Sequence, residues 1–288
     1  MDNRIQILKQ ENKVGWYNDS VFNRSTAENA LRFHKSLTAY RETELKQLSN
    51  AAKKYGVKDI LVKDESTRFG LKSFKGLGGS YAVFRILCDQ LGMDYTSAVY
   101  QDFLDAGIRR QCEAIEFVTA TDGNHGKGVA WAAGLFGCKS YVLLPKGSAD
   151  ARKQAIEKAG ASSVIVTDLN YDQTVAYAEK LAAENGWILV QDTAWEGYEE
   201  TPLRIIEGYL TMAQEIITQM AGKKPTHVFL QAGVGAVAGG VTAYLLNTYK
   251  DDSPSITIAE PSTVACIYLS AEISCPLSMY ISRFRIDS

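Results

Sequence analysis

The chain has 288 residues, of which 46% are hydrophobic and 22% are charged, and its formal net charge is −2. This composition is typical of a globular protein large enough for two domains or lobes. The small net charge argues against nucleic-acid and anionic-membrane partners, and no apolar run approaches the ~20 residues of a membrane span. The first residues, MDNRIQILKQENKVGWYND, lack the apolar core of a signal peptide. Five scattered cysteines without a CxxC pair predict reduced thiols, a cytoplasmic location and no metal site.

Strand and helix patterns alternate along most of the chain. Residues 43–56 predict a helix that ends at Gly56, and 92–111 look like an insertion. The predicted strands are 59–65, 114–120, 140–145, 162–167, 187–192, 226–231 and 255–260. The further predicted helices are 79–92, 126–137, 151–160, 172–186, 201–220 and 237–250. This alternation predicts an α/β fold with parallel sheets covered by helices on both faces.

Ligands of such folds bind at the carboxyl ends of strands, where loops meet helix N-termini. Four unusual segments follow predicted strands in this chain. They are SFKGLGG with Lys75, TDGNHGKG at 121–128, QDTAWEG with Asp192, and AGVGAVAGG at 232–240. Because all four segments follow predicted strands, we expect them to form one ligand site together.

The segment AGVGAVAGG follows a strand and opens a helix. Gly233 and Gly235 allow backbone N–H groups to point at an anion, and the helix N-terminus favours negative charge. A phosphate cradle is the functional interpretation, and a tight turn with small residues is the structural one. The pattern Gly233-x-Gly235-x-x-Ala238 also fits a dinucleotide fingerprint, with Glu260 ending the next strand. That dehydrogenase interpretation leaves Lys75 and TDGNHG without roles.

The two aspartates each have a structural and a functional interpretation. Asp122 can cap the helix that follows it, and Asn124 offers an amide donor for a ring hydroxyl or a substrate carboxylate. His125 is expected to make a local hydrogen bond. Asp192 can be a turn residue, but beside Trp195 and Tyr198 its carboxyl group could have a raised pKa and act as a base.

Together these segments resemble the fold-type II pyridoxal-phosphate enzymes. SFKGLGG resembles the segment whose lysine forms the Schiff base, and TDGNHGKGVAWAA resembles their S-x-GNH-x-x-G-x-A segment, with Asp122 in place of the usual serine. AGVGAVAGG resembles their phosphate loop. The segments TRFGLKSFKGLGGSYA, TATDGNHGKGVAWAA, QDTAWEGYEE and FLQAGVGAVAGGV are similar to the diaminopropionate ammonia-lyase branch, and the resemblance runs from about residue 15 to about residue 270.

This resemblance implies a tryptophan synthase β-like fold with two lobes of parallel sheet flanked by helices. Residues 1–70 and 195–288 would form the large domain and 71–194 the small one. The ending ISCPLSMYISRFRIDS does not resemble the family, which implies a truncated C-terminal part that would otherwise supply later strands and the group facing the pyridine nitrogen. A homodimer is the family expectation.

The resemblance also implies the cofactor, the reaction and the site residues. Pyridoxal 5'-phosphate would be bound by Lys75, Asn124 and the loop residues Gly233, Val234, Gly235, Ala236 and Val237. The substrate would be a small amino acid, 2,3-diaminopropionate in its D and L forms, converted to pyruvate and ammonia. Asp122 and Asp192 would be the bases for the two isomers, and Asp122 would also attract the substrate's second ammonium.

Three alternatives to this lyase stay open. The first is a serine or threonine dehydratase or a β-replacement enzyme that uses the same cofactor, against which Asp122 argues. The second is an inactive, truncated remnant that binds pyridoxal phosphate or a partner chain. The third is the nicotinamide dehydrogenase. An absorbance band near 410–420 nm is roughly what a lysine-bound pyridoxal phosphate should give, and it would separate most of these.

Overall fold

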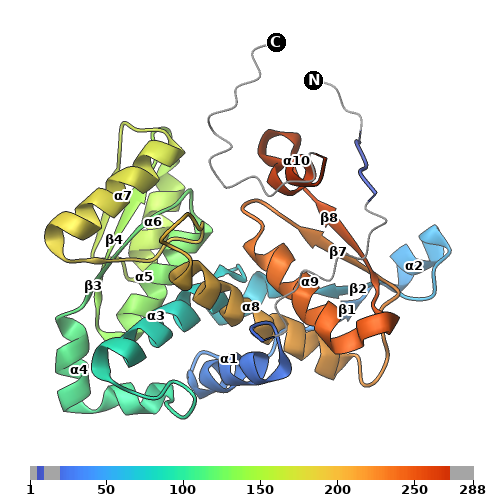
Figure 1. Cartoon of the computed structure of the whole chain (residues 1–288), viewed down its shortest axis with the longest axis horizontal. Helices are drawn as coiled ribbons and strands as arrows, with labels where there is room; N and C mark the ends of the chain where they lie inside the picture. Colours follow the sequence, from blue (N-terminus) through green and yellow to red (C-terminus); the bar gives the residue numbers. More distant parts are fainter. Residues whose placement is uncertain (1–4, 10–19, 273–288) are drawn as a thin grey trace.

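A computed structural model describes residues 5–9 and 20–272, whose strands form three sheets (Figure 1). The largest sheet is parallel, with the strand order β5-β4-β3-β6. Its strands are β3 (Glu116–Ala120), β4 (Lys139–Leu144), β5 (Ser163–Val166) and β6 (Ile188–Leu189). A second parallel pair consists of β7 (His227–Gln231) and β8 (Ser255–Ala259). The α/β class and the parallel sheets predicted from the sequence are therefore confirmed.

Alternating side chains of the large sheet bury its two faces against different helices. Val142 packs with Ile156 on the face covered by α5 and α6, whereas Leu143 packs with Ala178 on the face covered by α7. The helices are α5 (Asn124–Phe136), α6 (Asp150–Ala159) and α7 (Tyr171–Asn185). The helices after β3, β4 and β5 each return the chain to the starting end of the sheet, so the four strands are parallel and their carboxyl ends lie at one edge.

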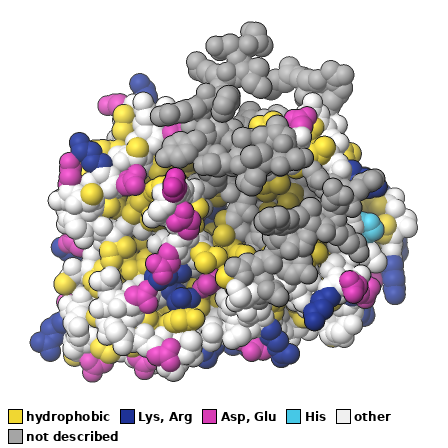
Figure 2. All heavy atoms as spheres, viewed as in Figure 1, with side chains coloured by type: hydrophobic (Ala, Val, Ile, Leu, Met, Phe, Trp, Pro, Cys, Tyr) yellow, Lys and Arg dark blue, Asp and Glu magenta, His cyan; other side chains and the backbone are white. Residues whose placement is uncertain are grey.

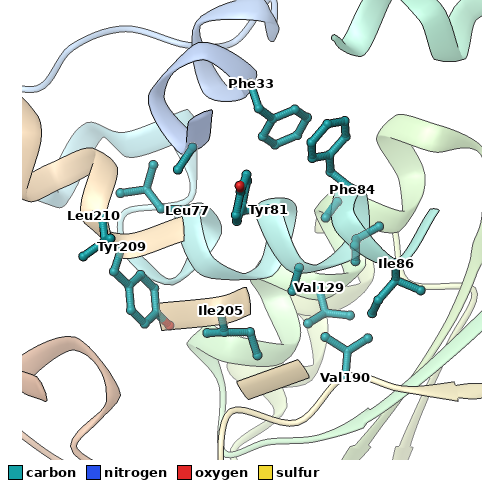
Figure 3. Packing of buried hydrophobic residues seen from close by; sticks show 14 of the residues in the cluster. Phe33, Leu77, Tyr81, Phe84, Ile86, Val129, Val190, Ile205, Tyr209 and Leu210 are labelled. Carbon is teal, nitrogen blue, oxygen red and sulfur yellow. The ribbon is translucent and has the colours of Figure 1, made fainter. Parts of the chain in front are cut away.

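Two long helices connect this sheet to the rest of the molecule. They are α3 (Lys75–Leu91) and α8 (Glu200–Gln219), and α8 runs between the lobe of the large sheet and the lobe of β7 and β8 (Figure 1). Buried aromatic side chains form the core around α3, where the rings of Phe33 and Phe84 stack at 4.1 Å (Figure 3). Phe33 comes from α1 (Arg24–Ser36), and α9 (Ala236–Tyr249) packs on the other side of α8.

The first part of the chain differs from its prediction. Residues 45–47 form β1 (Leu45–Gln47), which pairs antiparallel with β2 (Leu61–Lys63), and only α2 (Ser49–Tyr55) is helical. The pairing of the two strands overrides the local helix propensity, and Lys46 forms an ion pair with Asp64, the residue after β2. Gly56 ends α2 with φ 66°, as predicted. The strand that precedes Lys75 is therefore not a parallel-sheet strand, and η1 (Glu65–Gly70) separates it from α3.

Several smaller elements complete the described chain. The predicted insertion contains η2 (Tyr100–Leu104) and α4 (Ala106–Glu113). The remaining elements are η3 (Lys250–Asp252), η4 (Ser262–Val264) and α10 (Cys266–Glu272). Helix α1, which the sequence analysis did not predict, begins where the side chain of Asn23 accepts a hydrogen bond from the N–H of Thr26 at 3.0 Å. The atypical ending, residues 273–288 with Cys275, lies outside the described residues.

Acidic and basic side chains are intermixed on the face of the molecule shown in Figure 2. Within residues 5–9 and 20–272, none of the helices is both long and apolar enough to cross a bilayer. The same residues contain no group of three or more His, Cys, Asp or Glu side chains arranged to hold a metal ion. Ligands of parallel α/β folds bind at the carboxyl ends of the strands, which is where the candidate site lies.

Candidate active site

Lys75 is the first residue of α3, and its ammonium group forms an ion pair with Asp192. Close helix packing sets its position. A Cβ atom at Gly128 of α5 would lie 2.9 Å from the carbonyl oxygen of Lys75, and one at Gly79 would lie 3.0 Å from the backbone of Gly128. Glycine at both positions lets α5 and α3 cross in backbone contact, which holds the first turn of α3 at the edge of the sheet.

Asp192 lies three residues beyond β6, and its side chain is 6% exposed. His125 of α5 faces it, with 3.7 Å between His125 Nδ1 and Asp192 Oδ2. Burial opposes ionisation of Asp192, but His125 and the Lys75 ammonium outweigh it and lower the pKa of Asp192 to about 2. The raised pKa expected from Trp195 and Tyr198 is therefore wrong, because the sequence could not show that a lysine pairs with this carboxylate.

The pKa of Lys75 is displaced in the opposite direction. Burial favours the neutral amine, but Tyr209 and Asp192 together raise the pKa of Lys75. The two shifts place the shared proton on the lysine and leave the aspartate ionised. In this structure Lys75 is thus an ammonium group, and it must lose a proton before it can act as a nucleophile.

Asp122 lies in the loop between β3 and α5, Asn124 is the first residue of α5, and both are exposed. The helix start is capped by Thr121, whose hydroxyl accepts hydrogen bonds from the N–H groups of Gly123 at 2.9 Å and Gly126 at 3.1 Å. The expectation that the Asp122 side chain caps α5 is therefore wrong, because the preceding threonine already supplies the acceptor. The carboxylate of Asp122 is left available for another charged group.

His125 and Tyr171 interact electrostatically with both aspartates. The charges of Asp122, Asp192 and Lys75 all act on both of these side chains. His125 Nε2 donates to the carbonyl oxygen of Val190 at 2.8 Å, which confirms the expected local hydrogen bond. The structure therefore brings Lys75 and Asp192 into contact and places Asp122 within electrostatic range of the same neighbours.

The glycine loop lies at the carboxyl end of β7 and opens α9. Gly235 immediately precedes α9 and has φ 86°, a left-handed backbone that favours glycine. A Cβ at Gly233 would find no heavy atom of the described chain within 4 Å, so there is space above the loop. Ala236 begins α9, and Val237, the second residue of that helix, is buried. The first-turn N–H groups of α9 are thus presented to that space.

Glu260 is not available for a ribose contact. Its carboxylate accepts hydrogen bonds from the N–H groups of Ile267 at 3.0 Å and Tyr268 at 2.7 Å, at the start of α10. The dehydrogenase interpretation requires the Glu260 carboxylate to bind the ribose of the dinucleotide. Because that carboxylate is already hydrogen-bonded to α10, only the glycine pattern still supports this interpretation. The turn of Gly233 and Gly235 remains compatible with an anion.

A cavity of about 560 Å³ joins the loop after Asp192 to the glycine loop. It is lined by Tyr171, Asp172, Val175, Ala176, Glu179, Thr193, Ala194, Trp195, Gly233, Val234, Ser262, Thr263, Val264, Ala265, Cys266 and Leu269. The Trp195 ring stacks on Tyr198 at 4.3 Å, which fixes the wall on the sheet side. The cavity thus brings two of the predicted segments to one space.

Two side chains near Lys75 were missed by the sequence analysis. Tyr171 begins α7, where its hydroxyl accepts a hydrogen bond from Gln191 at 3.2 Å. Tyr209 lies in the middle of α8 and is fully buried beside the first turn of α3. Both are tyrosines within amphipathic helices, a pattern that also fits ordinary core residues.

Comparison with known proteins identifies the family of this chain. A family model described as pyridoxal-phosphate dependent enzyme matches residues 37–287. The diaminopropionate ammonia-lyase of Escherichia coli (strain K12) is 47% identical over 252 residues, which are 87% of this chain and 62% of that protein. The corresponding protein of Salmonella typhimurium is 46% identical over 255 residues, which are 88% of this chain and 63% of that protein.

Solved structures give the same assignment. The holo diaminopropionate ammonia lyase from Escherichia coli superposes with a TM-score of 0.84 at 46% identity, covering 89% of this chain and 65% of that one. The same enzyme in complex with D-serine superposes with a TM-score of 0.84 at 46% identity and the same coverage. The family match also extends beyond residue 270, into the ending that the sequence analysis set apart. The chain therefore belongs to the pyridoxal-phosphate dependent enzyme family.

Proposed function

We propose that this chain binds pyridoxal 5'-phosphate through Lys75 and takes part in the elimination of ammonia from 2,3-diaminopropionate. The observation that carries the proposal is the buried pair of Lys75 and Asp192 with a second carboxylate, Asp122, in the neighbouring loop. The similarity to diaminopropionate ammonia-lyases supports the choice of substrate. The chain spans 62% of the length of that relative.

The residues present fit this cofactor. Gly235 has the left-handed backbone that an anion-binding turn requires, and the space above Gly233 has room for a phosphate group. Lys75 supplies the amine. Pyridoxal phosphate, when bound, serves as an electron sink for a negative charge that develops at the substrate Cα. We assign Gly233, Val234, Gly235, Ala236 and Val237 to the phosphate and Asn124 to the ring or the substrate carboxylate.

The protein side chains then provide the proton transfers. Asp192 accepts a hydrogen bond from Lys75 Nζ, so the pair can hand one proton between them while the lysine changes between ammonium and amine. Once separated from Lys75, Asp192 is an ionised carboxylate in a buried site, where it can remove a proton from the substrate. Asp122, which is exposed, can do so from a different direction and can pair with the substrate's second ammonium.

Chemical trapping tests the role of Lys75. Borohydride reduction of the chain incubated with pyridoxal phosphate should fix the cofactor on the peptide that contains Lys75, and Lys75→Ala should abolish this adduct. Lys72→Ala is the matched control, because Lys72 is an exposed lysine three positions away. Attachment of the cofactor to another lysine, or an unchanged adduct in Lys75→Ala, would overturn the assignment.

Substrate stereochemistry tests the roles of the aspartates. The Cα protons of the D and L isomers point to opposite faces of the cofactor plane, so one fixed base cannot reach both. We expect Asp122→Asn to reduce pyruvate release from the D isomer more strongly and Asp192→Asn to reduce it more strongly from the L isomer, typically by ~10²–10⁴-fold. Equal and small losses with both isomers would mean that Lys75 is the base and the aspartates only bind substrate.

The dehydratase alternative predicts a different substrate preference. An ion pair with the exposed carboxylate of Asp122 is worth up to ~1 kcal/mol after screening by solvent, so Asp122 favours a substrate with a second ammonium over one with a hydroxyl. Faster release of pyruvate from serine than from diaminopropionate would favour the dehydratase. We also propose that the chain is cytoplasmic and forms a homodimer. Sedimentation of the purified chain tests the dimer.

A further inference from the structure

The ring of Tyr209 is fixed against the turn of α3 that carries Lys75 (Figure 3). A Cβ atom at Gly78 would lie 2.6 Å from Cε1 and 2.7 Å from Cζ of Tyr209, so the ring occupies the space left by that glycine. Phe74 meets the ring edge-on, with centroids 5.2 Å apart and planes at 75°. Because Phe74 precedes Lys75 and Gly78 follows it by one turn, the ring position is tied to Lys75 from both sides.

The hydroxyl of Tyr209 is buried and has no hydrogen-bond partner among the described residues. A buried hydroxyl without a partner destabilises the folded chain, whereas phenylalanine would fill the same space without that cost. Burial and the nearby charge of Asp192 outweigh the opposing charge of Lys75 and raise the pKa of Tyr209 to about 12, so the hydroxyl keeps its proton at neutral pH. The unpaired hydroxyl has a physical reason if a hydrogen-bond partner reaches it in another state of the site.

We propose that the Tyr209 hydroxyl is a second resting position for the Lys75 amine, which it holds when Asp192 is engaged by another group. The proposal rests on the proposed function, in which Lys75 and Asp192 must separate. An ammonium has three N–H donors and only one is needed for Asp192, so a second can point to Tyr209. A hydroxyl also donates to a neutral amine, which an ionised carboxylate cannot do. Tyr209 is thus a positioning residue that suits both protonation states of Lys75.

The other groups facing Lys75 are Asp192, Tyr171 and His125. Asp192 follows β6 and forms the ion pair, and Tyr171 on α7 accepts a hydrogen bond from Gln191. His125 on α5 places Nδ1 toward Asp192. Tyr209 on α8 therefore offers Lys75 a hydroxyl without displacing an existing hydrogen bond.

The test measures the reactivity of Lys75 in the cofactor-free chain. A limiting amount of acetic anhydride is added at a series of pH values, and acetylation of the Lys75 peptide is quantified by mass spectrometry. While Asp192 is present, Tyr209→Phe should leave acetylation nearly unchanged, because the hydroxyl has no hydrogen-bond partner in the ion-paired state. In an Asp192→Asn background the hydroxyl is the main remaining partner, so adding Tyr209→Phe removes an acceptor, lowers the pKa of Lys75 and should raise acetylation by ~3–10-fold.

Tyr81→Phe is the matched control, because Tyr81 on α3 is also fully buried with an unpartnered hydroxyl but faces Arg85. It should leave the labelling of Lys75 unchanged. Neither tyrosine variant should lower the urea midpoint, since each removes an unpaired polar group. Unchanged Lys75 labelling when Tyr209→Phe is added to Asp192→Asn, or an equal change when Tyr81→Phe is added instead, would overturn the proposal. The chain contains no cofactor in this experiment, so failure of cofactor binding would be seen separately, in the borohydride test.

Discussion

Replacement of Gly128 by alanine tests whether the crossing of α5 and α3 holds Lys75 in place. The new Cβ would lie 2.9 Å from the Lys75 carbonyl oxygen, 3.1 Å from the Lys75 carbonyl carbon and 3.3 Å from the N atom of Gly76. All three are backbone atoms that cannot rotate away. The closest contact must lengthen from 2.9 Å to the ordinary 3.4 Å, so the helices must separate by about 0.5 Å.

Two opposing terms set the size of the effect. Alanine favours the helix over glycine by ~1 kcal/mol, and overpacking costs ~1–3 kcal/mol. Gly134→Ala is the matched control, because Gly134 lies in the same helix and a Cβ there would meet no described atom within 4 Å. The helix gain is common to both variants, so Gly128→Ala should be less stable than Gly134→Ala by ~1–3 kcal/mol.

Urea unfolding of the two alanine variants measures this difference directly. The displaced atoms belong to Lys75, so Gly128→Ala should also slow borohydride trapping of pyridoxal phosphate by roughly tenfold, while Gly134→Ala should not. Equal stability of the two variants would refute the argument that backbone contact fixes the crossing. Lower stability with unchanged trapping would show that the crossing supports the fold but not the position of Lys75.

Two further predictions concern the glycine loop and a buried histidine. Gly235→Asp places a negative charge at the start of α9 and should weaken pyridoxal phosphate binding at least tenfold, because the charge repels the phosphate. Gly222→Asp is the control, since φ is 83° at Gly222 and 86° at Gly235; equal weakening in both would mean that backbone strain, not charge, is responsible. Burial lowers the pKa of His34 to about 3, so the unfolded chain binds a proton that the folded chain does not between that pH and ~6.5. Stability should therefore fall as the pH drops below ~6.5, with His34 contributing up to ~1.4 kcal/mol per pH unit, and urea titrations of His34→Gln at pH 7 and 5.5 should lack this contribution; an unchanged slope would contradict it.

The sequence predicted most of the helices and parallel strands because their apolar patterns and glycine stops are local. It failed between residues 43 and 65, where a three-residue strand depends on its partner strand rather than on its own pattern. It also missed α1, whose start depends on a cap at Asn23. Short elements that need a partner carry little signal of their own.

The site was predicted at the level of segments but not of contacts. Lys75 and Asp192 are separated by 117 positions, and their pairing depends on β6 lying beside β3 and on α3 packing against α5. The pKa of Asp192 could not be predicted from its sequence neighbours, because Lys75 and His125 determine its direction. Tyr209 gave no signal, since a tyrosine on the apolar face of a long helix resembles any core aromatic residue.

The buried pair of Lys75 and Asp192 implies an order of events. Removal of one member of a buried ion pair leaves an uncompensated charge that costs ~3–5 kcal/mol, so the pair cannot open until another group replaces one partner. A substrate ammonium can replace Lys75 beside Asp192, and the Tyr209 hydroxyl can receive the lysine amine at the same time. In that arrangement Asp192 faces the substrate while Lys75 stays in the site. The exchange of partners, rather than a fixed position of either side chain, would then let one lysine serve as cofactor anchor and one aspartate as base.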